Sequence, residues 1–167
     1  ATRDPIWTAA EFMVTAVSGD RETARRIARQ LPPELLGDSP RIDREQPIDA
    51  LLAAEILRLS GRAEQAARVA QAVVRRFDAA PSEYRDTDAL WIRAIAFASL
   101  GDTDRAIDEL ERARAQGFRM LVDDAYFLRL EDYPMMANVV KAPRFRSFVR
   151  AVEADNAKMR ARLSARA

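Results

Sequence analysis

Three glycines, each followed five residues later by an alanine, divide most of this chain into helical hairpins. The pairs are Gly19 with Ala24, Gly61 with Ala66, and Gly101 with Ala106. Each pair stands between two apolar segments, and the glycines recur with a period of about 40 residues. A recurrence of this length is typical of a solenoid, in which neighbouring hairpins stack and bury a continuous core. We therefore expect an array that binds partners rather than an enzyme.

The residues of each pair suit a turn between two antiparallel helices. Glycine adopts the left-handed backbone conformation that reverses the chain, and a small alanine lets the second helix approach its partner closely. Asp20, and Asp102 or Thr103, are the expected N-caps of two of the second helices. Alanine, leucine, arginine and glutamate dominate the composition and favour helix. Because period-two apolar alternation is absent, we expect an all-α fold without a sheet.

We expect one domain made of three hairpin units and a C-terminal helical cap. The predicted bounds are 5–33, 47–78 and 87–117 for the units and 123–167 for the cap. Within the cap, the pattern predicts a short helix over 123–130 and a helical turn over 135–140. A final helix is expected to begin at Pro143 and to project or fray in its polar second half.

The third unit carries a dense set of small and large apolar residues in order. They are Ala89-Leu90-Trp91, Ala94, Leu100-Gly101-Asp102, Ala106-Ile107 and Ala113. This pattern resembles the tetratricopeptide repeat family, and Ala54, Leu57, Ala66 and Ala70 keep it in the second unit. The first unit departs from it at Phe12, where the family has a small residue. The period also exceeds the family's about 34 residues, which places the extra residues in the loops between units.

The resemblance implies a right-handed superhelical array whose concave groove is lined by the first helix of each unit, and it implies capture of a partner's peptide or helix there. The groove residues that follow from the glycine register are Met13, Val17, Leu51, Glu55, Arg58, Trp91 and Ile95. An aromatic residue and a lone arginine on an apolar surface suit an anchor site. Two other interpretations stay open: Trp91 and Met13 belong to the core, or the C-terminal segment of the chain itself fills the groove.

The residue types argue against catalysis and metal binding. The chain has no cysteine and no histidine, which removes the commonest general base and the commonest zinc ligand. No phosphate-binding loop or nucleophile motif is present. The acidic pairs Asp123-Asp124 and Glu131-Asp132 lack a spaced third ligand, so we interpret them as caps or solvated charges. We expect no enzyme activity, no cofactor and no metal.

The net charge and the hydropathy of the chain limit the kinds of partner that it is expected to bind. A net charge of +1 is no footprint for nucleic-acid binding, and no apolar run is long enough to span a membrane. The arginine-rich last helix suggests a solvated face, and its Phe148, Val152 and Met159 leave open a homodimer formed through that helix. The absence of cysteine fits the cytoplasm and leaves the periplasm open.

A second pattern concerns the setting of the domain. Leu130-Glu-Asp-Tyr-Pro134 followed by Ala142-Pro-Arg-Phe-Arg146 resembles the end of helical repeat regions in bacterial multidomain regulators. The chain begins at Ala1 without methionine, and we expect a region of a longer protein. The leading hypothesis is a scaffolding module that binds a protein or peptide partner. The alternative is a ligand-sensing regulatory domain of a transcription regulator or nucleotide cyclase.

Overall fold

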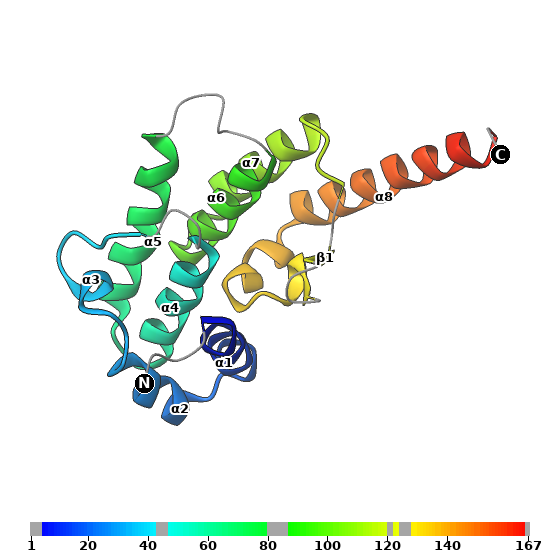
Figure 1. Cartoon of the computed structure of the whole chain (residues 1–167). Coiled ribbons are helices and arrows are strands. Elements are labelled where there is room, and N and C mark those ends of the chain that lie inside the picture. The colour runs from blue at the N-terminus through cyan, green and yellow to red at the C-terminus, as the bar shows by residue number, and fades with distance from the viewer. Residues whose placement is uncertain (1–4, 43–46, 80–86, 120–121, 124–127, 166–167) are drawn as a thin grey trace.

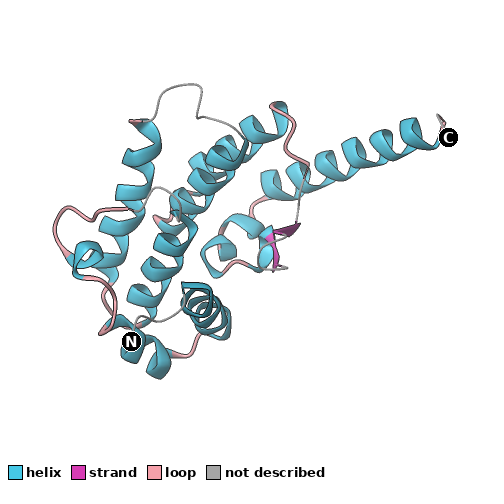
Figure 2. Cartoon of the chain, viewed as in Figure 1, coloured by secondary structure: helices cyan, strands magenta, loops and turns pink. Residues whose placement is uncertain are grey.

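The structure is a computed structural model that describes residues 5–42, 47–79, 87–119, 122–123 and 128–165. The expected all-α fold is confirmed, and helices dominate the described residues (Figures 1 and 2). The helices are α1 (Pro5–Ser18), α2 (Arg21–Ala28), α3 (Pro33–Leu36), α4 (Pro47–Leu59), α5 (Ala63–Asp78), α6 (Thr87–Ser99), α7 (Thr103–Ala115) and α8 (Pro143–Ser164).

The three predicted turns are present, each with a glycine in the left-handed region. Gly19, Gly61 and Gly101 have φ values of +68°, +89° and +77°. They join α1 to α2, α4 to α5 and α6 to α7. The carboxylate of Asp20 accepts hydrogen bonds from the backbone of Glu22 and Thr23 at the start of α2, and Asp102 caps α7. These local predictions are confirmed.

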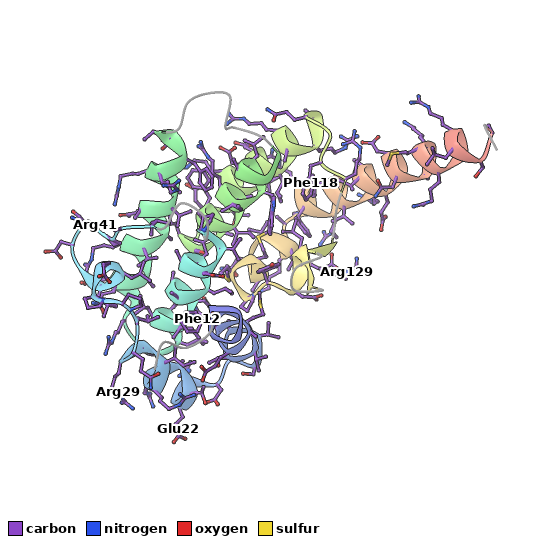
Figure 3. The ribbon with its side chains drawn as sticks, in the orientation of Figure 1. Phe12, Glu22, Arg29, Arg41, Phe118 and Arg129 are labelled. Atoms are coloured by element: carbon purple, nitrogen blue, oxygen red, sulfur yellow. The ribbon has the colours of Figure 1, made fainter. Side chains whose placement is uncertain are left out.

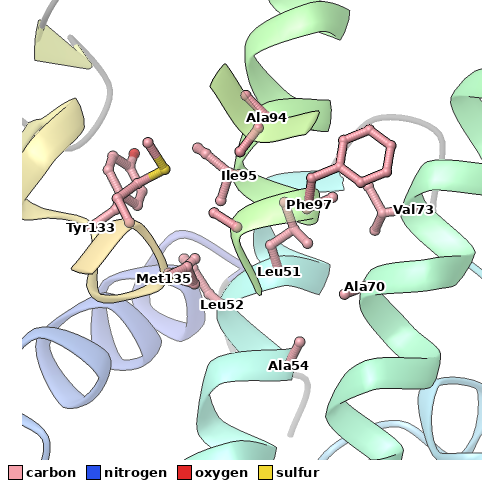
Figure 4. Packing of buried hydrophobic residues seen from close by; sticks show 14 of the residues in the cluster. Leu51, Leu52, Ala54, Ala70, Val73, Ala94, Ile95, Phe97, Tyr133 and Met135 are labelled. Carbon is pink, nitrogen blue, oxygen red and sulfur yellow. The ribbon is translucent and has the colours of Figure 1, made fainter. Parts of the chain in front are cut away.

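The core runs through all three hairpins because each first helix packs against its neighbours. Helix α4 contacts α1, α2, α5 and α6, and α6 contacts α4, α5 and α7. The alanines that follow the turn glycines, Ala24, Ala66 and Ala106, are all buried. In Figure 4, Phe97 of α6 points toward Val73 of α5, on the side where the second helices lie. Small residues thus let the helices approach, and large ones fill the remaining space.

The segment after α7 differs from the prediction. The helix expected over 123–130 is wrong, because Val122–Asp123 (β1) pairs antiparallel with Leu128–Arg129 (β2). This two-residue ladder also corrects the expectation of no sheet (Figure 2). Three 3₁₀ turns follow, η2 (Leu130–Asp132), η3 (Pro134–Ala137) and η4 (Val139–Lys141). The helical turn expected over 135–140 is therefore confirmed. We call residues 130–141 the 3₁₀ segment.

Helix α8 begins at Pro143 as predicted, and its two halves differ. Phe145, Phe148 and Val152 of the first half are buried, and this half packs against α7 and η4. Asp155 forms an ion pair with Arg114 at 2.9 Å. From residue 157 to residue 165 every described side chain is exposed. The second half leaves the body of the molecule, and its side chains extend into solvent (Figures 1 and 3). Within the described residues, none of the helices combines the length and the apolar character needed to cross a membrane.

Candidate interaction surfaces

The 3₁₀ segment covers the face of the first helices that the sequence assigned to a groove. Its turn η3 contacts α6, and the rings of Tyr133 and Trp91 meet edge to face with centroids 6.1 Å apart. Tyr133 and Met136 are fully buried. Figure 4 shows Tyr133 and Met135 facing Ile95 of α6 and Leu52 of α4. Residues of the chain itself thus cover this face, which we call the inner face and on which the resemblance implies capture of a peptide.

The seven predicted groove residues differ in their exposure to solvent. Leu51 and Ile95 have no exposed surface, and Met13 and Glu55 are also buried. Trp91 is half-buried against Tyr133. Only Val17 and Arg58 are largely exposed, at 49% of the residue and 54% of the side chain. Most of the predicted groove residues are therefore packed in the interior, and only two of the seven are accessible to a partner.

Glu55 holds the exposed Arg58 in a two-point contact on α4. The Arg58 Nε donates to one carboxylate oxygen at 2.7 Å, and a terminal nitrogen donates to the other. Because of these hydrogen bonds, the pKa of the Arg58 guanidinium lies above its ordinary value. Glu55 is buried and its charge needs this partner. Glu55 and Arg58 thus pair with each other, and the carboxylate partly offsets the charge that the exposed Arg58 presents to an acidic partner.

The 3₁₀ segment belongs to the core because the apolar surface that it buries contributes substantially to the stability of the fold. It buries four large side chains, Leu130, Tyr133, Met135 and Met136. Burying a side chain of this size contributes about 1.5–3 kcal/mol, so exposing all four would cost on the order of 8 kcal/mol. The whole free energy of unfolding of a domain is about 5–15 kcal/mol. A partner that bound the inner face by displacing this segment would have to offset this cost through its own contacts.

An exposed apolar stripe lies instead on α1. It consists of Ala10, Val14 and Val17, which we call the end face; Val14 is 68% exposed and Val17 is 49% exposed. At the same distances before the next turn glycine, α4 carries Leu52 and Ile56, which have no exposed surface, and Leu59, which is partly exposed. Helix α4 has the α1–α2 hairpin packed against it. The position of Val14 is thus buried on α4 and α6 but open on α1, whereas Leu59 and Ser99, the equivalents of Val17, are themselves partly exposed.

One feature that the sequence reasoning missed is a buried ion network between the second and third hairpins. Arg93 of α6 pairs with Asp78 of α5 at 3.0 Å and with Glu109 of α7 at 3.2 Å. The side chains of Arg93 and Glu109 are 13% and 5% exposed. Arg112 adds a second contact to Glu109. The sequence did contain a signal for this network, because Arg93 is the one charged residue within the apolar run 89–98 of α6.

The acidic pair Glu131-Asp132 in the C-terminal region forms a local backbone hydrogen bond and a local ion pair with arginine. The carboxylate of Asp132 accepts a hydrogen bond from the backbone N–H of Arg129 at 3.2 Å, and Glu131 pairs with the Arg129 guanidinium at 2.8 Å. This agrees with their interpretation as capping or solvated charges. The pair that includes Asp124 lies partly outside the described residues.

Comparison of the chain with known proteins does not assign it to a family. No protein-family model matches the chain, and no curated protein or solved structure gives a significant match.

Proposed function

We propose that this chain is a tetratricopeptide-like module that binds an amphipathic helix of a partner protein on the end face of α1. The observation that carries the proposal is the contrast at equivalent positions: Val14 is 68% exposed, whereas Ile56 and Ala96 have no exposed surface. In the second and third hairpins the equivalents of Val14 belong to the core, at the contact between packed helices. The end face continues that contact on the first hairpin, so a helix is the occupant that fits it.

The chemistry of the end face defines the partner. Glu11 is the single charged residue of α1, and it is paired with Arg26 at 2.7 Å. The stripe itself contains alanine and valine, whose small side chains let a helix approach closely. Burial of apolar surface therefore drives the association, and binding depends little on salt. The partner helix is expected to present its own apolar stripe, without a charge at its centre.

Head-to-tail stacking of a second copy on the end face is disfavoured. Head-to-tail stacking would need an open face beyond the third hairpin, but α8 and η4 pack against α7 there. Arg144 of α8 contacts Asp108 and Glu111 of α7, each at 2.9 Å. The array is thus closed at one end and open at the other. This asymmetry argues against head-to-tail stacking of copies, and light scattering distinguishes a face-to-face dimer through α1 from binding of a different polypeptide.

The proposal is tested with charge placed on the stripe. Val14→Glu and Val17→Glu each put a carboxylate into the contact, and Gln71→Glu puts one at an exposed position of α5 as the matched control. A partner is first captured with the wild-type chain, and its helical segment is then purified and titrated by calorimetry. We expect at least tenfold weaker binding for both valine variants, since a buried unpaired charge is costly, and unchanged binding for the control.

Two results would contradict the proposal. One is equal affinity of the purified helix for the wild type and for Val14→Glu, with circular dichroism showing the same helix content. The other is a wild-type dimer in light scattering that Val14→Glu dissociates, because the occupant would then be a second copy.

The alternative function, a ligand-sensing regulatory domain, requires a cavity. The described residues contain one beside α8, and it is the observation that favours this alternative. A small effector would raise the melting temperature of the isolated chain, which a partner-binding module without a ligand site would not show.

A further inference from the structure

A cavity of about 370 Å³ lies between the first half of α8 and the 3₁₀ segment. Its lining residues are Glu131, Val140, Phe145, Arg146, Val149 and Arg150. The volume falls in the range of small-ligand sites, about 300–1,000 Å³. None of the residues that line the cavity belongs to α1, so the cavity and the end face are separate sites.

The walls of the cavity separate into an apolar part and a cationic rim. Val140, Phe145 and Val149 supply the apolar part, and Arg146 and Arg150, one turn apart on α8, are exposed at the rim. Most of the lining surface is apolar, as in sites that hold a ligand by its hydrocarbon body and orient it with a few polar groups.

The two rim arginines differ from the other arginines nearby because no carboxylate neutralises them in the described part of the chain. Arg144 has Asp108 and Glu111, and Arg114 has Asp155. Arg146 donates to the backbone oxygen of Lys141 at 3.3 Å and Arg150 donates to the Ser147 hydroxyl at 3.4 Å. A guanidinium has five N–H donors, so both retain donors for a ligand.

The one acidic residue at the cavity does not oppose an anion. Glu131 is paired with Arg129 at 2.8 Å, so its charge is already matched. The site therefore offers two unmatched positive charges above an apolar floor. Guanidinium binds carboxylate with parallel hydrogen bonds, and the floor suits a flat aromatic or branched aliphatic body.

We propose that this cavity binds a small carboxylic acid with a compact apolar body, held by Arg146 and Arg150 through its carboxylate and by Phe145, Val140 and Val149 through its hydrocarbon part. The contact with two exposed guanidinium groups gives modest affinity. The proposal goes beyond partner binding at α1, and it stands or falls separately from it.

The probe for this site is 2-naphthoate, with the neutral 2-naphthamide as its isosteric comparison. Methyl resonances of Val140 and Val149 are followed by NMR during titration of the intact chain. We expect saturable shifts of these methyl groups with 2-naphthoate and at least fivefold weaker binding of the amide. The valines of the end face, Val14 and Val17, are expected to keep their resonance positions.

The variant Arg146→Gln/Arg150→Gln is expected to lose at least fivefold in affinity for 2-naphthoate. Arg160→Gln/Arg162→Gln removes the same charge from the projecting half of α8 and is expected to bind as the wild type does. Equal binding of acid and amide would overturn the proposal, as would equal loss in the two double variants. Absence of methyl shifts up to the solubility limit of the acid would also overturn it.

Discussion

At the scale of single residues, the turn glycines are needed for their backbone conformation and not for space. Gly61 and Gly101 have φ values of +89° and +77°, and no atom lies within 4 Å of a Cβ added at either position. A side chain there costs about 1–2 kcal/mol because of the left-handed backbone. Gly37 has an equally open surrounding but a φ of −73°.

We therefore predict that Gly61→Ala and Gly101→Ala each lower the free energy of unfolding by about 1 kcal/mol, measured by urea denaturation. Gly37→Ala is the control and is expected to be neutral or slightly stabilising, because alanine restricts the unfolded chain. A loss of stability at Gly37 equal to that at Gly61 would contradict the conformational explanation.

The Arg93–Glu109 ion pair is a second feature at this scale, and its contribution to the free energy of unfolding depends on the presence of both partners. Arg93→Met leaves the buried Glu109 with only the exposed Arg112 as a cation, and we predict a loss of about 3 kcal/mol in the free energy of unfolding. The double variant Arg93→Met/Glu109→Leu removes both charges. We predict that it recovers most of the loss, because apolar residues pack well at such sites. Thermal and urea unfolding measure both; a double variant as unstable as Arg93→Met would contradict this.

At the scale of elements, the hairpins could be predicted from the sequence and the C-terminal region could not. The turn glycines, the caps Asp20 and Asp102 and the helical spacing are local signals, and each correctly marked an element. The contact of Tyr133 with Trp91 joins distant parts of the chain. The ladder of β1 with β2 is local, but with two residues in each strand it is too short for a period-two alternation to mark it. No local pattern specified those contacts, so the sequence left open whether the inner face holds a partner or the chain itself.

The 3₁₀ segment is accordingly predicted to stabilise the fold. Tyr133→Ala removes a fully buried ring that contacts Trp91, and we expect a loss of about 3–5 kcal/mol in the free energy of unfolding. Met159→Ala, at a position 48% exposed on the projecting half of α8, is the control and should change it by less than about 0.5 kcal/mol. A stable, folded Tyr133→Ala chain with an open inner face would show that the segment is a removable cover.

At the scale of the whole molecule, the two ends of the hairpin series are unlike. Helix α8 packs against the last hairpin, whereas α1 and α2 lie at the other end of the series (Figure 1). Phe145 and Phe148 of α8 are buried and Arg144 is bound to α7, while Val14 of the first hairpin is exposed. The inner face between them is filled by the 3₁₀ segment. The helix-binding surface that we propose is therefore at the open end, and the groove derived from the repeat register contributes to it only through Val17.

Site-specific photo-crosslinking compares these two surfaces most directly. A benzoylphenylalanine is placed at Val14 on the end face in one variant and at Arg58, the exposed residue of the predicted groove, in another. After irradiation in cells that produce the protein, we expect one discrete adduct with a partner helix from position 14, which the added substitution Val17→Glu abolishes, and none from position 58. An adduct with a partner from position 58 and none from position 14 would contradict the account and return the binding surface to the inner face.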